Sequence, residues 1–355
     1  MKSTFIKLSS DIDSLVNYID YNLATKKFIA KSKKTETTLQ SEAKLIDILN
    51  PKFKVFEYNS YMISLYGIFE GFLEQILEKY LEELGDTYDC YHDLPQSIQK
   101  NNLTKVNDLI SKLQLPKYQE LEAKKIIATL HHNLNESSTE LCIPAFTHHS
   151  ANFRVNSISE YFSESGIPGI LKELGDTNPM NDRLKDEYSN PSSIKDDIKF
   201  SIITDLAERR NHIAHGVEAQ AILQPNEIRD WCLYLKDFCD SLYQTVLSNL
   251  FSPLVENSDL KLKNIIITKL EVLDIYGGRI LGFQSKNLQV KIGQDILIYR
   301  NKIPKCFTRE VQGITINKKP ISRCPIYIDK AVGLDLTSGI SDRYSFYLIQ
   351  RKNSM

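Results

Sequence analysis

Residues 56–84 decide the fold of the first part of the chain, and they read FEYNSYMISLYGIFEGFLEQILEKYLEEL. Apolar side chains recur in this stretch at every third or fourth position: Tyr61, Leu65, Phe69, Phe72, Ile76, Tyr80 and Leu84. An α-helix has 3.6 residues per turn, so this spacing places them on one face. We expect one long helix here that forms a wall of the core and stops near Gly85.

Helical spacing extends to both sides of this stretch. Residues 4–24 predict a helix, and the polar segment that follows it predicts a linker. Residues 102–135 predict two shorter helices that separate at Pro116, and residues 141–192 predict short helices joined by loops.

Two further helices are expected before the pattern changes. Residues 192–213 are periodic, with Ser192 or Ser193 as the N-cap and Ile198 on the apolar stripe, and this helix ends at Gly216. A helix that follows Pro225 reaches about residue 250 and is closed by Pro253.

After residue 261 the pattern becomes that of short β-strands. Five apolar runs, separated by turn residues, carry this signal: 265–267, 280–283, 288–292, 296–299 and 344–349. Gly277-Gly278 is a turn signal between two strands. We therefore expect a small β-barrel.

The composition describes a folded protein with two electrically different parts. The chain has 355 residues, 42% of them hydrophobic, which excludes a disordered chain and favours two domains. Residues 259–355 contain 17 Lys and Arg against 8 Asp and Glu, a formal charge of +9 that leaves −10 for residues 1–258. A basic module of this kind favours contact with polyanions.

Cysteine usage and hydropathy predict a cytoplasmic protein that makes no membrane contact. The six cysteines form no Cys-x-x-Cys pair, so we expect reduced thiols. The apolar runs are too short to cross a bilayer, and the N-terminus lacks the apolar core of a signal peptide. His131-His132 and His148-His149 match no common zinc spacing, so no metal and no cofactor are expected.

Residues 209–216, Arg-Arg-Asn-His-Ile-Ala-His-Gly, carry the chemistry. Guanidinium is a permanent cation whose planar fork fits phosphate oxygens, and imidazole exchanges a proton near neutrality. RNA carries its own nucleophile in the 2′-hydroxyl, so these two groups suffice to cleave it without a metal. Arg210 is the expected phosphate clamp and His215 the general base or acid, with Asn211 orienting the imidazole or the phosphate.

This motif resembles that of a known superfamily. Residues 210–216 have the form Arg-Asn-x-x-x-His followed by a small residue, which is similar to the signature of HEPN domains, helical nucleotide-binding and RNase proteins. Residues 61–72, aromatic with one acidic residue, resemble the early helix of the same superfamily. The likeness spans roughly residues 45–250 and is nearest to stand-alone HEPN proteins of bacterial defence and toxin loci.

The resemblance and the change of period together predict an α+β multidomain protein. Residues 1–44 are the expected N-terminal helix and linker, and residues 45–252 an all-α HEPN-like helical bundle with a loop-rich insert at about 136–192. Residues 259–355 are the expected small, basic β-barrel.

Three residues are expected to support the site. Glu70 lies beside the apolar stripe of its helix, so a pairing with Arg209 or Arg210 is predicted, either to hold the arginine or as a simple salt bridge between helices. His212 is adjacent to the motif residues and is read as structural. The helix macrodipole alone also favours Arg and His at a helix C-terminus.

One ideal helix cannot aim Arg210 and His215 in the same direction, because five residues turn through roughly 140°. The helix must therefore loosen near Gly216, or Arg210 must reach. The resemblance implies that a homodimer brings two motifs to one cleft.

Basic residues outside the motif are candidates for RNA binding. Arg154 lies within the polar segment 149–156, which is expected to line the cleft, and this arginine is expected to contact the substrate. The basic residues of the barrel region are Lys286, Lys291, Arg300, Lys302, Lys305, Lys318, Lys319 and Arg323. Tyr299 and Phe307 are available for stacking on bases. The alternative is that basic residues merely protect strand edges from aggregation.

The barrel region has a resemblance of its own. Residues 293–299, 309–321 and 331–336 resemble, in this order, the second, β-barrel domain of translational GTPases. No sequence of the form Gly-x-x-x-x-Gly-Lys-Ser/Thr occurs, so the resemblance is limited to the barrel.

The resemblance to HEPN proteins implies an endoribonuclease that leaves 2′,3′-cyclic phosphate and 5′-hydroxyl ends. The expected substrate is RNA such as tRNA or ribosomal RNA, and the expected setting is phage defence or a toxin–antitoxin system with a neutralising partner. Two alternatives stay open: a non-catalytic HEPN module that binds a nucleotide, RNA or a partner, and a barrel that docks on translation machinery while the helices dimerise.

Overall fold

The chain folds into two compact units, each built from two segments. Met1–Lys79 and Thr147–Tyr243 form the first unit, and Tyr80–Phe146 and Gln244–Met355 form the second. The computed structural model describes residues 1–32, 40–149, 152–217, 221–285, 288–317, 319–322, 330–337 and 339–352. The domain limits expected from the sequence stay a prediction.

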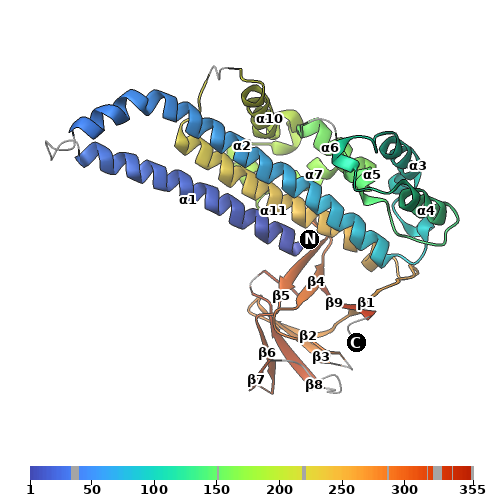
Figure 1. Cartoon of the computed structure of the whole chain (residues 1–355). Helices are drawn as coiled ribbons and strands as arrows, with labels where there is room; N and C mark the ends of the chain where they lie inside the picture. Colours follow the sequence, from blue (N-terminus) through green and yellow to red (C-terminus); the bar gives the residue numbers. More distant parts are fainter. Residues whose placement is uncertain are drawn as a thin grey trace. The chain divides into compact units, whose positions relative to one another are not determined.

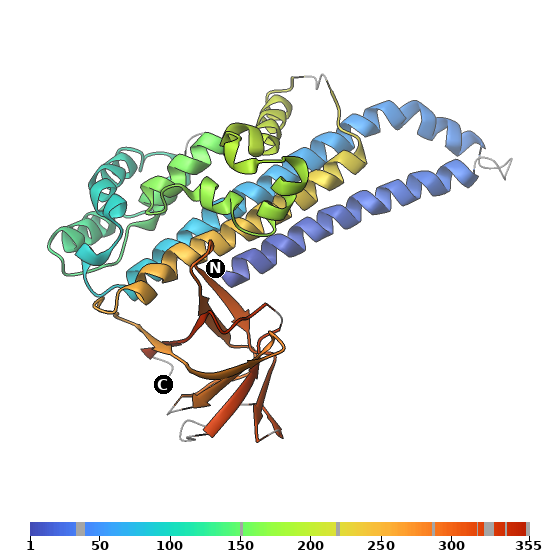
Figure 2. The same cartoon turned by 180° about the vertical axis from the view of Figure 1, so that it is seen from behind.

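Three long helices dominate the first unit. They are α1 (Lys2–Ser32), α2 (Gln40–Thr87) and α11 (Pro225–Glu256), and the last two continue into the second unit. Within the first unit they run side by side (Figures 1 and 2). Lys236 on α11 donates to Asp13 on α1 at 2.6 Å, and the rings of Phe5 and Tyr243 stack with centroids 5.4 Å apart.

The long helix predicted from the apolar stripe is confirmed and is longer than expected. All seven residues of the stripe are at most 3% exposed. The helix starts at Gln40, however, and continues through Gly85 to Thr87. The loss of backbone freedom at a helical glycine costs only about 1 kcal/mol, and burial of the neighbouring Leu84 offsets it.

Short helices cover the side of α2 that lies opposite α1 (Figures 1 and 2). They are α6 (Val155–Glu164), α7 (Ile170–Gly175), α8 (Met180–Glu187), η4 (Pro191–Ser193), α9 (Asp196–Lys199) and α10 (Ser201–Ala214). The short helices expected between residues 141 and 192 are therefore confirmed.

The single helix expected over 192–213 is wrong, because the chain breaks at Phe200. This residue has φ −113° and ψ 25° and is the N-cap of α10, so neither Ser192 nor Ser193 caps the helix. The Phe200 ring is fully buried, edge-on to Phe238 with centroids 5.5 Å apart. Ile198, expected on the stripe, is 54% exposed.

The second unit begins with a helical part. It contains η2 (Tyr91–Asp93), α3 (Gln96–Ser111), η3 (Pro116–Tyr118), α4 (Ala123–Leu134) and the start of α5 (Ile143–Thr147). The predicted separation of two helices at Pro116 is confirmed. Buried Asn102 ties α3 to its neighbours by donating to the Tyr91 hydroxyl at 2.9 Å and to Asn133 Oδ1 at 3.1 Å.

The described strands of the second unit form two antiparallel sheets. The first has the order β1 (Ile265–Lys269), β9 (Ser345–Arg351), β4 (Asp295–Tyr299), β5 (Cys306–Glu310). The second has the order β2 (Glu271–Tyr276), β3 (Ile280–Ser285), β8 (Lys330–Asp335), β6 (Gly313–Ile316), β7 (Lys319–Ile321).

The closed barrel expected from the sequence is wrong, although the strands are present. A barrel needs hydrogen-bonded neighbours on both sides of every strand, and within the described ranges no strand of one sheet pairs with a strand of the other. Instead the sheets share one core, which includes Phe283 and Leu334 from one and Ile298 and Phe346 from the other.

The turn predicted at Gly277-Gly278 is confirmed. It joins β2 to β3, and both glycines have positive φ, 59° and 62°, as a type I′ hairpin turn requires. Helix α11 runs through Pro253 to Glu256, so the expected stop at this proline is wrong. In the described part of the chain, no helix has the length and apolarity needed to cross a membrane.

Candidate functional site

The predicted motif occupies the last turns of α10, and the helix ends within it. Ala214 is the last helical residue, and His215 follows with φ −92° and ψ 6°. Gly216 has φ +67°, its N–H donates to the Ile213 carbonyl at 3.1 Å, and the Val217 N–H donates to the His212 carbonyl at 2.9 Å. This is a Schellman cap, which explains the glycine. The loosening expected near Gly216 is therefore present.

Arg210 and Asn211 form a closed polar triangle with Asn152, a residue outside the motif. Arg210 Nη1 donates to Asn152 Oδ1 at 3.3 Å and to Asn211 Oδ1 at 3.5 Å. Asn152 Nδ2 donates to Asn211 Oδ1. All three side chains are half-buried, so the arrangement fixes the arginine while leaving part of it open to solvent.

Tyr66 on α2 forms the floor beneath the arginine. The Arg210 guanidinium carbon lies 5.3 Å from the centre of the Tyr66 ring. The Tyr66 hydroxyl accepts the Phe153 N–H at 2.9 Å and donates to Glu70 Oε1 at 3.2 Å. Burial, followed by the charge of Glu70, raises the pKa of Tyr66 far above its usual range, so this side chain stays neutral and acts as a fixed support.

The predicted ion pair between Glu70 and an arginine is wrong. Within the described ranges neither Arg209 nor Arg210 pairs with this carboxylate, whose hydrogen-bond partner is Tyr66, one helical turn away. A same-helix tyrosine satisfies the half-buried carboxylate without the desolvation of a second charge.

Arg209 has a positioning role that the sequence did not reveal. It donates to Asp205 Oδ1 at 3.0 Å, to the Tyr58 hydroxyl at 2.9 Å and to the Ala221 carbonyl at 2.7 Å. Its guanidinium also lies 5.5 Å from the centre of the Trp231 ring. Arg209 thus binds α10 to α2, to α11 and to the segment that follows the motif.

Both histidines of the motif are exposed. Neither the His215 nor the His212 imidazole has a hydrogen-bond partner in the part of the chain that the structure describes. The His215 backbone N–H donates to the Asn211 carbonyl at 3.0 Å, which fixes where its side chain starts. The structure therefore brings Arg210 and Asn211 into contact, and leaves His215 beside them without a direct contact.

The polar segment around residue 152 lies along the motif. Arg154 Nε is 4.0 Å from Glu208 Oε1, and the Arg154 side chain is 43% exposed. The His149 ring donates from Nε2 to Glu74 Oε1 at 2.8 Å and packs on Phe153 with centroids 4.2 Å apart. Arg154 therefore lies next to the helix that carries the motif, and its contact with substrate stays a prediction.

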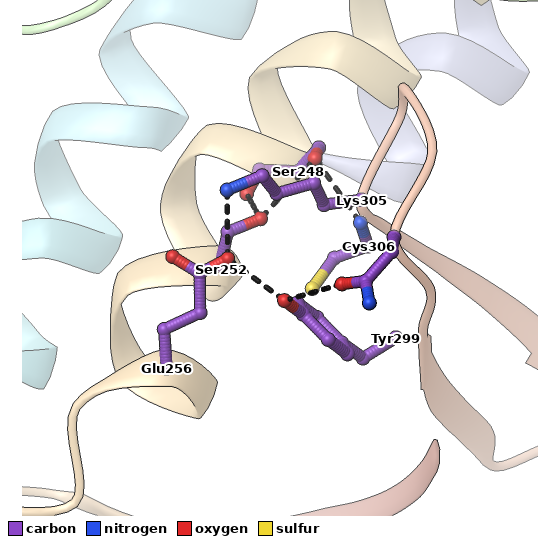
Figure 3. Close-up of polar contacts among 7 residues, drawn as sticks. Ser248, Ser252, Glu256, Tyr299, Lys305 and Cys306 are labelled. Atoms are coloured by element: carbon purple, nitrogen blue, oxygen red, sulfur yellow. Dashed lines mark hydrogen bonds and ion pairs between the residues drawn. The ribbon is translucent and has the colours of Figure 1, made fainter. Parts of the chain in front are cut away.

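Some basic residues of the second unit are engaged within the protein (Figure 3). Lys305 donates to Glu256 at 2.7 Å and so lowers the pKa of that carboxyl, and Tyr299 donates to Glu256 at 2.9 Å. Arg300 donates to the Pro304 carbonyl at 3.1 Å and lies 4.9 Å from the centre of the Phe307 ring.

The prediction that Phe307 stacks on bases is therefore wrong. That ring is 5% exposed and lies within 5.0 Å of both Arg300 and Arg309, so it belongs to the core. Phe307 follows the buried Cys306 in β5 and the next three residues are half-buried, so the strand lacks the alternation that would have marked its core face.

Three of the predicted basic residues face solvent. Lys291, Lys302 and Lys319 are exposed and have no side-chain partner within the described ranges. Lys318 lies outside the described residues, as do Lys286 and Arg323. Across the residues the structure describes, no three His, Cys, Asp or Glu side chains gather as metal ligands.

Sequence reasoning missed two members of the site, Tyr66 and Asn152. Tyr66 precedes Glu70 by one helical turn, and this spacing was the available signal for their contact. Asn152 lies in a loop far from the motif in sequence, and no local pattern relates them.

Comparison with known proteins defines the class. The model of the RiboL-PSP-HEPN family matches residues 27–248, which is more than half of the chain and includes α10 and the whole motif. The chain therefore belongs to the RiboL-PSP-HEPN family. A HEPN-type domain points to an RNA-related or nuclease function at the level of the family. No curated protein matches the chain.

Proposed function

We propose that this protein is a metal-independent endoribonuclease of HEPN type. The observation that carries the proposal is the Arg210–Asn152–Asn211 triangle, held over Tyr66. His215 follows at the end of the same helix, and its imidazole is exposed and has no hydrogen-bond partner within the described ranges. A fixed cation next to a titratable ring is what phosphodiester cleavage by the 2′-hydroxyl requires.

The residues divide the reaction among them. His215 takes the 2′-hydroxyl proton or gives one to the leaving 5′-oxygen, and Arg210 stabilises the charge that develops on the phosphorane. The products are a 2′,3′-cyclic phosphate and a 5′-hydroxyl. Asn152 and Asn211 accept from Arg210 and so fix the direction of its fork; they are positioning residues.

A homodimer completes the proposal. Phe56 and Ile63 are 69% and 49% exposed. Phe56, Ile63 and Glu70 follow one another at intervals of seven residues, so all three lie on one face of α2. A second copy on this face would cover the apolar side chains and bring a second motif close to the first.

The substrate and setting follow from chemistry and charge. The exposed residues Lys291, Lys302 and Lys319, with Arg154 in the first unit, supply cations for a structured RNA such as tRNA or ribosomal RNA. The setting is phage defence or a toxin–antitoxin system in the cytoplasm.

The test is expression of the wild type, His215→Ala and Arg210→Ala with mapping of RNA ends after brief induction. We expect 5′-hydroxyl ends and growth arrest for the wild type and for His212→Ala, and neither for His215→Ala or Arg210→Ala. His212→Ala is the matched control, because His212 is equally exposed and lies on the same turn. Equal cleavage by all four proteins would refute catalysis by this site.

One observation favours a second function, a non-catalytic HEPN module that binds RNA, a nucleotide or a partner. His215 makes no contact with Arg210 in the described structure, so the arginine triangle alone forms a phosphate-binding site. RNA binding that needs Arg210 but is unchanged in His215→Ala, without product ends, is the expected result for this alternative.

A further inference from the structure

A cavity of about 360 Å³ is lined by residues outside the motif, and no step of the proposed reaction uses it. It belongs to the first unit and is bounded by α1, α2 and the segment that leads into α11. The apolar part of its lining consists of Leu23, Ile222, Leu223, Pro225 and Ile228. Its volume falls within the range of about 300–1,000 Å³ that is typical of small-molecule sites.

The polar part of the lining offers hydrogen-bond donors that the protein leaves unused. Tyr58 and Tyr61 are each 2% exposed. The Tyr61 hydroxyl accepts from Asn22 at 2.7 Å, and the Tyr58 hydroxyl accepts from Arg209 at 2.9 Å. In the described ranges neither phenol donates its own proton to an acceptor, although a buried donor is normally satisfied.

The lining of the cavity carries more positive than negative charge. Lys26 is paired with Glu57, and both line the cavity. Lys54 also lines it, is exposed, and has no partner within the described part of the chain. An occupant with an anionic group therefore gains an ion pair with Lys54 and accepts from the two phenols.

We propose that this cavity is an effector site for a small organic anion with a flat apolar body. The anionic group binds Lys54 and the hydroxyls of Tyr58 and Tyr61, and the apolar body packs on Leu223 and Ile228. This site is separate from the Arg210–His215 motif.

The site is connected to the motif by Arg209. This arginine donates to Tyr58, which lines the cavity, and to the carbonyl of Ala221, which immediately precedes the lining residue Ile222. An occupant that moves either partner moves the residue next to Arg210. The resulting control of cleavage rests on the proposed ribonuclease function, whereas binding of the anion does not.

The probe for binding is 1-anilinonaphthalene-8-sulfonate, which combines a flat apolar body with a sulfonate. We expect saturable binding of one probe per chain to the full-length protein. Lys54→Glu should weaken binding by about tenfold, the loss of one charged contact. Lys52→Glu is the matched control, because Lys52 is exposed on the same helix and does not line the cavity, and it should bind as the wild type does.

Two further variants separate the cavity from the exposed apolar surface nearby. Leu223→Trp fills the cavity and should abolish binding, whereas Phe56→Ser should leave it unchanged. Loss of binding in Phe56→Ser together with full binding in Leu223→Trp would overturn the proposal. So would equal affinities in the Lys54→Glu and Lys52→Glu proteins.

Trp231 reports the connection to the motif without any need for cleavage. It is the sole tryptophan of the chain, and the centre of its ring lies 5.5 Å from the Arg209 guanidinium carbon. Binding of benzenesulfonate, a flat anion that does not absorb where tryptophan emits, should change Trp231 emission in the wild type and in Lys52→Glu. Saturable binding that leaves this emission unchanged would overturn the connection while the site itself stands, and neither result depends on whether the protein cuts RNA.

Discussion

At the scale of single residues, the site depends on side chains that hold Arg210 as much as on Arg210 itself. Asn152 both accepts from the arginine and donates to Asn211, so it is the one residue that closes the triangle. It comes from a loop between α5 and α6, far from the motif in sequence.

Asn152→Ala is expected to lower kcat by about tenfold to a hundredfold with a smaller effect on KM, because a hydrogen bond to a charged group contributes about 1.5–3 kcal/mol. Initial rates on a fixed RNA substrate provide the measurement. Asn156→Ala serves as control, since Asn156 is exposed in the same region. A rate equal to that of the control variant would remove Asn152 from the site.

Gly216→Ala tests the cap that releases His215 from the helix. A Cβ at this position would meet no atom within 4 Å, so the cost arises only from φ +67°. We expect a loss of about 1 kcal/mol in the free energy of unfolding. Chemical denaturation measures it, and an unchanged midpoint would contradict the assigned cap.

At the scale of elements, two features of the sequence pattern predicted the structure. Strong periodicity on α2 predicted its core face correctly, and the turn glycines predicted the β2–β3 hairpin. The break at Phe200 and the contact of Arg209 with Tyr58 were not predictable, because each involves a residue distant in sequence, Phe238 or Tyr58. The contact of Glu70 with Tyr66 spans one helical turn, so the sequence held its signal. Local propensity is a weak prior against such contacts.

Tyr66→Phe is expected to destabilise the first unit by about 1–3 kcal/mol, because the buried Phe153 N–H loses its acceptor. Thermal or chemical unfolding measures the change. Tyr21→Phe is the control, since Tyr21 is 66% exposed. The Tyr66 variant should also cleave more slowly, because α2 no longer fixes the loop that carries Asn152.

The contact between α11 and the β4–β5 hairpin makes the stability of the second unit depend on pH (Figure 3). The hydrogen bond from Lys305 lowers the pKa of Glu256 in the folded protein, so the unfolded chain binds the proton more tightly. This contribution to stability is present above the ordinary carboxyl pKa and is lost as pH falls through the folded value. Glu256→Gln should make the free energy of unfolding depend less on pH in the acid range. Above pH ~6 the difference in this free energy between the variant and the wild type should be constant.

At the scale of the whole molecule, the proposed function requires that two chains form a homodimer. Phe56→Asp combined with Ile63→Asp should convert a dimer to a monomer in sedimentation experiments, because two charges cannot be buried in an apolar interface without partners. Cleavage should disappear with the dimer. A monomeric wild-type protein that cuts RNA at full rate would contradict the homodimer.

The order of the chain has a consequence for how the protein is made. Tyr66 and Asn152 are translated before Arg210, and Trp231, which holds Arg209, comes last. A ribosome must therefore pass residue 243 before the first unit is complete. A nascent or prematurely terminated chain that ends before Trp231 therefore holds the motif together with Tyr66 and Asn152, but its Arg209 lacks the contact with α11.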